Sequence, residues 1–258
     1  MLIRVAHRSA GTAGERAGAR TAFALTAFVA WAGVVMTLLV SATGAGVERV
    51  PEPYLYGIHP AGAAGALSRV VDTLSYFTFW SNAVVGLSAT LLLVRPHLDT
   101  FAVRALRLSA LLMITVTAIV YAVILAPTDV VAGWSRITNP LQHIVTPAVT
   151  VGAWLVWGPR RWFTWRTVPA ALVIPVTWIA WMLLRGLFIE AYPYGFANVA
   201  VLGYGAVAVN LLFVVAFGLA IAALYLAVDR ALAAIGGRSA RARHDARPPD
   251  RHHDVRHG

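Results

Sequence analysis

The sequence contains no cysteine and no lysine, and charged residues make up only 12% of it. Without cysteine, the chain has no disulfide bond, no thiolate nucleophile and no cysteine-ligated zinc or iron–sulfur site. No acidic residue falls within any of the long apolar runs. A carboxylate dyad, a proton-relay chain or the buried aspartate of a serine-type triad therefore has no evident source there. We expect neither a cofactor nor a metal ion.

Apolar residues are abundant instead. They account for 59% of the 258 residues, and the mean hydropathy is +0.70. This composition is typical of an integral membrane protein and not of a soluble domain. The net charge of +10 would suggest nucleic acid as a partner for a soluble protein. Here most arginines lie in the tails and two short loops, so we expect membrane lipids as partners and no nucleic acid.

Six apolar runs are long enough to cross a bilayer as helices. Each has about 18–23 residues or more, and a rise of about 1.5 Å per residue carries such a helix across a hydrocarbon core of about 30 Å. The sequence thus predicts an all-α, polytopic protein of the cell membrane with six transmembrane helices. The runs are residues 21–42, 73–94, 108–128, 137–159, 167–184 with a possible extension to 189, and a last, longer run that ends at 228.

The distribution of arginine predicts the orientation. Four arginines precede the first run, three lie in each of the second and fourth loops, and seven lie in the C-terminal tail, whereas the first, third and fifth loops hold two, one and none. The positive-inside rule then places both termini in the cytoplasm. The predicted division is a basic cytoplasmic N-terminus (1–20), a transmembrane domain (21–228) and a disordered basic cytoplasmic tail (229–258). The tail either attracts anionic lipids or serves only as a topology anchor.

His143 is the first candidate for a functional residue, because no other histidine lies within an apolar run. An ionisable side chain at membrane depth is costly and persists mainly where it has a partner or a chemical role. Asn139 followed by Pro140 has the pattern of an N-cap and first helical residue. This pattern predicts that His143 lies in the first turn, where the positive helix end favours neutral imidazole. Its alternatives are an interhelical hydrogen bond or a water-lined cavity.

Thr78 is the candidate partner of His143. In the predicted topology both residues lie in the outer half of their helices, and their depths differ by about 3 Å. A hydroxyl and an imidazole at matched depth form a nucleophile and base if their helices are neighbours. The alternative is that Thr78 bonds to its own backbone or bridges two helices. Asn139 is four residues before His143 on the same helix face, so it is a candidate to orient the ring.

Other polar side chains belong to the same outer half. Ser81 and Asn82 lie within about one turn of Thr78, and Tyr121 approaches the outer end of the third run. Ser81, Asn82 and Asn139 are candidate hydrogen-bond donors to an oxyanion. Asn82, Asn139 and Tyr121 are also candidates to bind or orient a substrate.

Arg185, near the outer end of the fifth run, is the deepest arginine. A guanidinium group binds carboxylates and lipid headgroups through paired hydrogen bonds, which predicts an orienting role toward a substrate. The alternative is that Arg185 extends to the membrane interface and binds nothing specific.

Three motifs carry a resemblance to known proteins: YFTFWSN at 76–82, NPLQHIVTP at 139–147 and YPYGF at 192–196. They resemble a bacterial family of six-span membrane proteins without an assigned activity. More distantly they are similar to the androgen-induced membrane proteins, intramembrane threonine hydrolases that cleave fatty acid esters of hydroxy fatty acids. In that family the catalytic pair is a threonine before phenylalanine and a histidine shortly before proline. The resemblance implies that Thr78 and His143 are the corresponding pair.

Two classes of function remain open at this stage. The first is an intramembrane hydrolase that cleaves lipid acyl esters with a Thr/His pair near the extracytoplasmic side. The second is a non-enzymatic protein that binds a lipid or another small ligand. A transporter is a third possibility, although the two halves of the chain show no repeat of the kind on which many transporters are built. The sequence indicates no oligomeric state.

Overall fold

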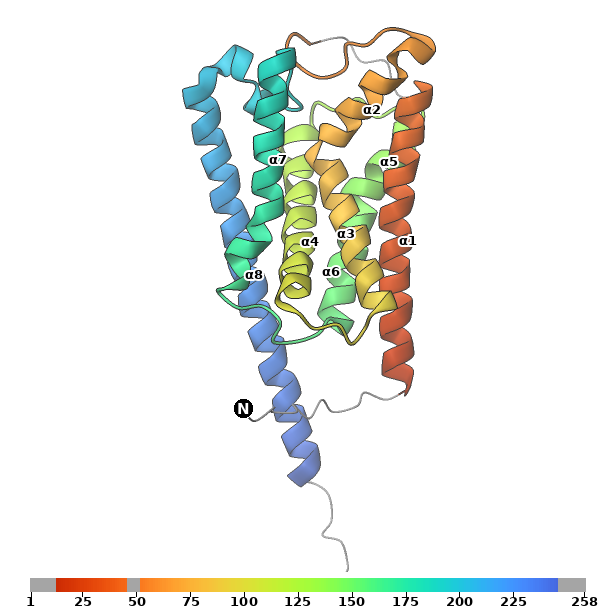
Figure 1. Cartoon of the computed structure of the whole chain (residues 1–258). Helices are drawn as coiled ribbons and strands as arrows, with labels where there is room; N and C mark the ends of the chain where they lie inside the picture. The colour runs from red at the N-terminus through yellow and green to blue at the C-terminus, as the bar shows by residue number, and fades with distance from the viewer. Residues whose placement is uncertain (1–12, 46–51, 246–258) are drawn as a thin grey trace, which may run out of the picture.

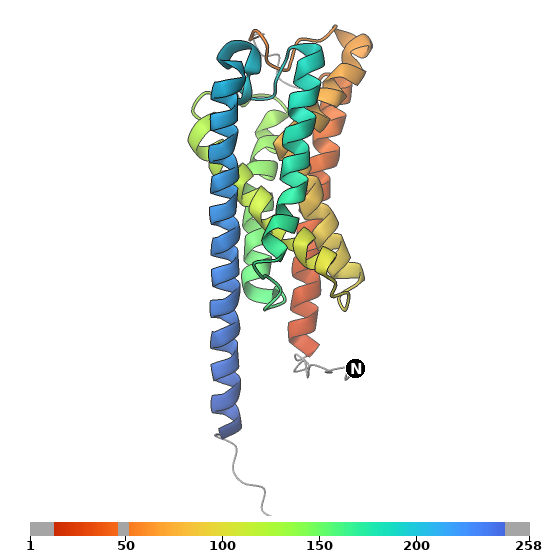
Figure 2. The same ribbon diagram turned by 60° about the vertical axis from the view of Figure 1, so that its left-hand side comes forward.

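The computed structural model describes residues 13–45 and 52–245. In this part of the chain the fold is a bundle of helices without a β-strand (Figures 1 and 2). A π-helical turn, Tyr121–Leu125, follows α4, and a second, Leu141–Val145, joins α5 to α6. The α-helices are α1 (Ala13–Thr43), α2 (Ala66–Ser75), α3 (Phe77–Val94), α4 (Phe101–Val120), α5 (Ser135–Pro140), α6 (Thr146–Trp157), α7 (Thr167–Ile189) and α8 (Val199–Asp245).

Five segments of the described chain are long and apolar enough to cross a membrane: α1, α3, α4 with its π turn, α7 and most of α8. The predicted run 137–159 is also helical, since α5, the second π turn and α6 follow one another without a gap. Asn139, Gln142 and His143 make this segment more polar than the other five. The all-α fold and the multi-pass character agree with the sequence prediction.

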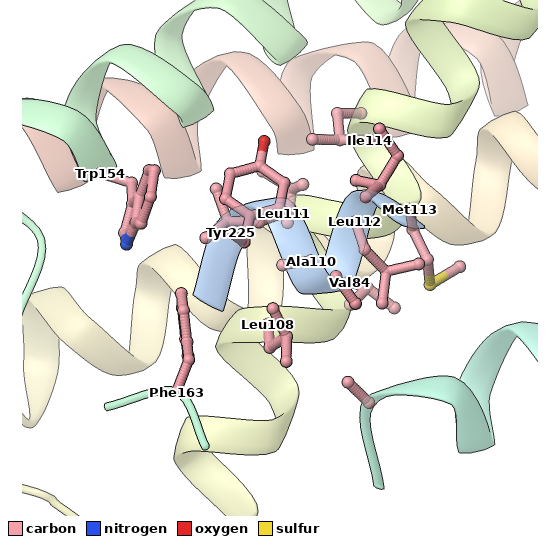
Figure 3. Packing of buried hydrophobic residues seen from close by; sticks show 14 of the residues in the cluster. Val84, Leu108, Ala110, Leu111, Leu112, Met113, Ile114, Trp154, Phe163 and Tyr225 are labelled. Carbon is pink, nitrogen blue, oxygen red and sulfur yellow. The ribbon is translucent and has the colours of Figure 1, made fainter. Parts of the chain in front are cut away.

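Helix α4 is the centre of the bundle. It contacts α3, α6, α7 and α8, while α1 packs on α3 and α6 (Figure 1). From Leu108 to Ile114 every residue of α4 is buried, as expected for a helix that is covered on all sides. Figure 3 shows the apolar side chains of this stretch in one cluster with Val84 of α3, Trp154 of α6 and Tyr225 of α8.

Close approach and hydrogen bonds hold the helices together, since lipid provides little hydrophobic force between them. Gly86 of α3 lies against the ring of Trp31 of α1, where even a methyl group would collide with the indole. The Trp31 indole also donates to the Thr90 hydroxyl at 3.1 Å. On the other side of the bundle, Thr115 of α4 and Tyr225 of α8 share a hydrogen bond of 2.7 Å.

Two boundaries differ from the sequence prediction near the arginine-rich end. Helix α4 begins at Phe101, so Arg107 lies inside the bundle and not in a basic loop. It is 1% exposed, and its guanidinium lies over the ring of Phe23 at 5.6 Å. Helix α8 continues past residue 228 to Asp245, so the predicted start of the tail at Asp229 lies within a helix. Residues 1–12 and 246–258, which hold most of the predicted terminal segments, are outside the described residues.

Asp229, the first residue of the predicted tail, has a structural role within α8. Its buried carboxylate accepts hydrogen bonds from the backbone N–H groups of Arg161 and Phe163, both at 3.2 Å. The α6–α7 loop is thereby attached to α8 at the end of the bundle where both described chain ends lie (Figure 1). A sequence pattern rich in arginine and poor in apolar residues does not reveal such a contact.

Candidate active site

Thr78 lies in the first turn of α3 because the chain breaks the predicted run 73–94 at Tyr76. Tyr76 is extended (φ −77°, ψ 140°), which separates α2 from α3. A break inside an apolar bundle is costly unless the released backbone groups find partners. The indoles of Trp80 and Trp178 donate to the carbonyls of the last two residues of α2, at 2.8 and 2.9 Å. The break is therefore well supported, and it places Thr78 beside the N-terminus of a helix.

His143 lies in the π turn between α5 and α6, which corrects the predicted helix start at Asn139. The helix begins at Ser135, whose hydroxyl accepts the Ala132 N–H at 2.9 Å. Pro147 has no N–H for the carbonyl four residues earlier, that of His143, and the wider π turn accommodates this loss. His143 is thus more than two turns from the helix start. The electrostatic effect of a helix N-terminus is confined to the first turn, so it does not act on the His143 imidazole as predicted.

The structure brings Thr78 and His143 together. The Thr78 Oγ1 atom is 3.2 Å from His143 Nε2. His143 Nδ1 faces two oxygens of Asn139, the backbone O at 3.0 Å and Oδ1 at 3.2 Å. Both oxygens accept hydrogen bonds, so Nδ1 carries the proton and Nε2 offers its lone pair to the Thr78 hydroxyl. This is the tautomer that a general base needs.

Asn139 connects the histidine to a carboxylate. Its Nδ2 donates to Asp129 Oδ2 at 2.7 Å, which orients the amide so that Oδ1 faces the imidazole. Tyr121 donates to the same carboxylate oxygen at 3.3 Å and stacks on the His143 ring, with centroids 3.9 Å apart and planes at 21°. The side chains of Thr78, His143, Asn139 and Asp129 form one hydrogen-bonded chain. An acidic partner therefore reaches the site from the α4–α5 loop although the apolar runs contain none.

Asn82 and Ser81 lie behind the pair and do not face it. Asn82 Nδ2 and the Ser81 hydroxyl both donate to the backbone carbonyl of Thr78, at 2.9 Å each. Asn82 also reaches the Gln142 carbonyl at 3.4 Å, and neither side chain is exposed. They hold the Thr78 backbone against the segment that carries His143. The amide of Asn139 donates to Asp129, so each of the three predicted oxyanion donors has a partner within the protein.

Arg185 is part of a separate cluster near the end of the bundle where α2 begins and α7 ends (Figure 1). Its Nη2 donates to Asp72 Oδ1 at 2.5 Å, and its guanidinium lies 4.4 Å from the centre of the Tyr56 ring. His59 Nε2 is 3.0 Å from the other oxygen of Asp72. The Arg185 side chain is only 12% exposed, so the protein covers most of it. Its paired carboxylate belongs to the protein, which favours a structural role over the predicted orientation of a substrate.

An apolar pocket opens beside Thr78, between α3, α4, α7 and α8. Along α4 and its π turn, the lining residues run from Leu112 to Leu125. Three hydroxyl groups line it, those of Thr78, Thr117 and Tyr194. The Thr117 hydroxyl already donates to Ser81 at 2.8 Å. The hydroxyl groups available to a ligand in this pocket are thus those of Thr78 and Tyr194.

Two members of this arrangement, Asp129 and Tyr194, were not singled out as site residues from the sequence. Asp129 looks like an ordinary loop residue, and Tyr194 belongs to the YPYGF motif, whose position relative to Thr78 depends on the packing of α7 and α8. No protein-family model, curated protein or solved structure matches this chain.

Proposed function

We propose that this protein is an intramembrane hydrolase of acyl esters in which Thr78 is the nucleophile and His143 the general base. The observation that supports the proposal best is the contact between Thr78 Oγ1 and His143 Nε2, with Nδ1 held by Asn139. A threonine hydroxyl is a weak nucleophile unless an adjacent base removes its proton. A base oriented by a third group is the arrangement found in nucleophile–histidine enzymes of unrelated folds.

The reaction has two halves. Thr78 Oγ1 attacks the ester carbonyl carbon while its proton passes to His143 Nε2, and the carbonyl electrons move to oxygen. Collapse of this intermediate breaks the bond to the alcohol oxygen, which takes the proton from His143. Water then attacks the acyl-threonine, again with His143 as base, and the carboxylic acid is released as Thr78 regains its proton. The Asn139–Asp129 connection holds the imidazole in position and stabilises its charged form.

The pocket favours a lipid as the substrate. Its lining is almost entirely apolar, which suits an acyl chain with the ester carbonyl at Thr78. A protein with five apolar helices of spanning length lies among lipid molecules, so lipid substrates are close to the pocket. No charged side chain lines this pocket, so a charged acyl group would find no ion-pair partner in it.

We further propose that the segment from Ser135 to Trp157 is a sixth span and that both termini face the cytoplasm. The second π turn and the two short helices form one continuous helical segment beside α1 and α4. The arginine distribution then puts Thr78 and His143 in the extracytoplasmic half.

The proposal is tested with a fluorophosphonate probe, which forms a covalent bond with an activated hydroxyl. The wild-type protein in detergent should be labelled, and Thr78→Val should not be, because it keeps the shape but lacks the hydroxyl. His143→Ala should reduce the labelling rate by about 10²- to 10⁴-fold, the usual contribution of a general base. Thr117→Val is the matched control, since Thr117 lines the same pocket but has no base beside it.

The outcomes separate an enzyme from a binding protein. Labelling of the wild type that disappears in Thr78→Val and survives in Thr117→Val supports the enzyme. A wild-type protein that is never labelled, or whose labelling is unaffected by Thr78→Val, contradicts it and favours a lipid-binding role for the same pocket.

A further inference from the structure

An ester hydrolase needs a hydrogen-bond donor for the negative charge that develops on the carbonyl oxygen. Removing one such donor typically reduces kcat by about 10²- to 10³-fold. The amides of Asn82 and Asn139 and the hydroxyl of Ser81 donate elsewhere. Another group that faces the pocket beside Thr78 is therefore a candidate donor.

The Tyr194 hydroxyl is placed for this role. It accepts the backbone N–H of Phe77, the residue before Thr78, at 3.1 Å. This N–H occupies an acceptor position on the phenol oxygen and does not use the phenol's own proton. Tyr194 and Thr78 line the same end of the apolar pocket. A carbonyl that approaches Thr78 from the pocket therefore brings its oxygen near this phenol.

The protonation state of Tyr194 suits a donor. Burial raises the pKa of Tyr194 to about 12, an increase that hydrogen bonds with the Thr78 side chain and with the backbone of Phe77 and Thr78 partly offset. A raised pKa means that the neutral phenol is favoured, so Tyr194 retains its proton at every pH well below 12. The side chain is 8% exposed, and little water competes for its proton.

The ring of Tyr194 is fixed by other aromatic side chains. Phe196 stacks on it with centroids 5.3 Å apart and planes at 3°, and Tyr76 meets it edge to face at 5.7 Å. Trp178 of α7 lies at 6.1 Å. A donor that is already oriented costs no rearrangement when the charge develops. The packing of the α7–α8 loop thus presents the hydroxyl to the first turn of α3.

We propose that Tyr194 is a catalytic residue that donates a hydrogen bond from its phenol to the carbonyl oxygen of the ester during attack by Thr78. This inference rests on the proposed hydrolase function and adds the group that stabilises the oxyanion. The phenol proton is shared with the oxyanion and is not transferred. Bond formation, bond breakage and proton transfer stay with Thr78 and His143.

The test compares Tyr194→Phe with the wild type on a 4-methylumbelliferyl acyl ester in detergent micelles. We expect kcat to fall by about 10²- to 10³-fold with little change in KM, since the interaction forms only as charge develops. A trifluoromethyl ketone with the same acyl chain, which forms a charged adduct with Thr78, should lose affinity by a similar factor. Tyr192→Phe is the control, because Tyr192 is a buried tyrosine of the same loop that does not line this pocket.

The two proposals fail in different ways. If the wild type neither hydrolyses the ester nor binds the ketone, the hydrolase function itself is contradicted. If the wild type is active and Tyr194→Phe keeps its kcat and its ketone affinity, only the role of Tyr194 is overturned. If Tyr194→Phe has a lowered Tm and does not fold, 3-fluorotyrosine is placed at position 194 instead. This residue keeps the hydroxyl group and makes it a stronger hydrogen-bond donor. Ketone affinity should then rise, and an unchanged affinity would overturn the proposal.

Discussion

At the scale of single residues, the site is a chain of hydrogen bonds in which each member sets the role of the next. Asp129 orients the amide of Asn139, and the amide oxygen together with the Asn139 backbone holds the proton on His143 Nδ1. The lone pair on Nε2 then faces Thr78. A change at Asp129 or Asn139, the members of this hydrogen-bond series farthest from Thr78, should therefore alter catalysis although neither residue touches the substrate.

The first residue-scale prediction concerns Asn139. Asn139→Ala removes Oδ1 and the link to Asp129 but leaves the backbone carbonyl that also accepts from Nδ1. Activity should fall by about 10- to 100-fold, the effect typical of residues that orient a functional histidine. The measurement is the rate of fluorophosphonate labelling. Asp129→Asn is the control, since it keeps an oxygen acceptor for the Asn139 amide and should lose less than Asn139→Ala. A larger loss in Asp129→Asn would mean that the charge of Asp129, and not the orientation of the amide, matters most.

At the scale of elements, departures from regular helix place the candidate residues. The break at Tyr76 puts Thr78 in a first turn, one π turn carries His143 and the other carries Tyr121. A π turn rotates the following side chains relative to a regular helix and is frequent at functional sites. The α7–α8 loop adds Tyr194, and its path depends on the contact between Tyr192 and α7.

The element-scale prediction tests that contact. Gly186 of α7 lies under the Tyr192 ring, and a β-carbon at this position would overlap the ring. Gly186→Ala should therefore destabilise the protein by about 1–3 kcal/mol, as overpacking of a core does. It should also reduce activity, because the displaced loop carries Tyr194. Thermal unfolding and labelling measure the two effects. Gly152→Ala in α6, where nothing lies within 4 Å of the added carbon, should be neutral or slightly stabilising, and equal effects of both changes would refute the role of the Tyr192 contact.

At the scale of the whole molecule, the bundle has one end formed by the α1–α2, α4–α5 and α7–α8 connections and an opposite end with the arginine-rich loops and both described chain ends (Figures 1 and 2). The candidate site lies toward the first end. If that end faces away from the cytoplasm, the proposed hydrolase takes its substrate from the outer leaflet.

The whole-molecule prediction is a labelling pattern in intact cells. The chain has no cysteine, so single cysteines report position without background. An impermeant maleimide should label Glu52→Cys and Val130→Cys in intact cells, and His97→Cys and Arg166→Cys only after lysis. All four positions are exposed. Labelling of Arg166→Cys in intact cells would contradict the proposed sixth span, and labelling of Val130→Cys only after lysis would contradict the placement of the site.

The sequence by itself determined the helical, multi-pass character, because long uncharged runs have few other stable arrangements in lipid. It also indicated Thr78 and His143, since an ionisable group stands out in an apolar run. Only the tertiary structure decided how polar groups are distributed among partners. It engaged Asn82, Ser81 and Arg185 in contacts within the protein, and it brought Asp129 and Tyr194 to the site from loops. The physical reason is that a hydrogen bond between distant residues depends on helix breaks, π turns and loop paths, which follow from the packing of all helices together and leave little trace in local sequence.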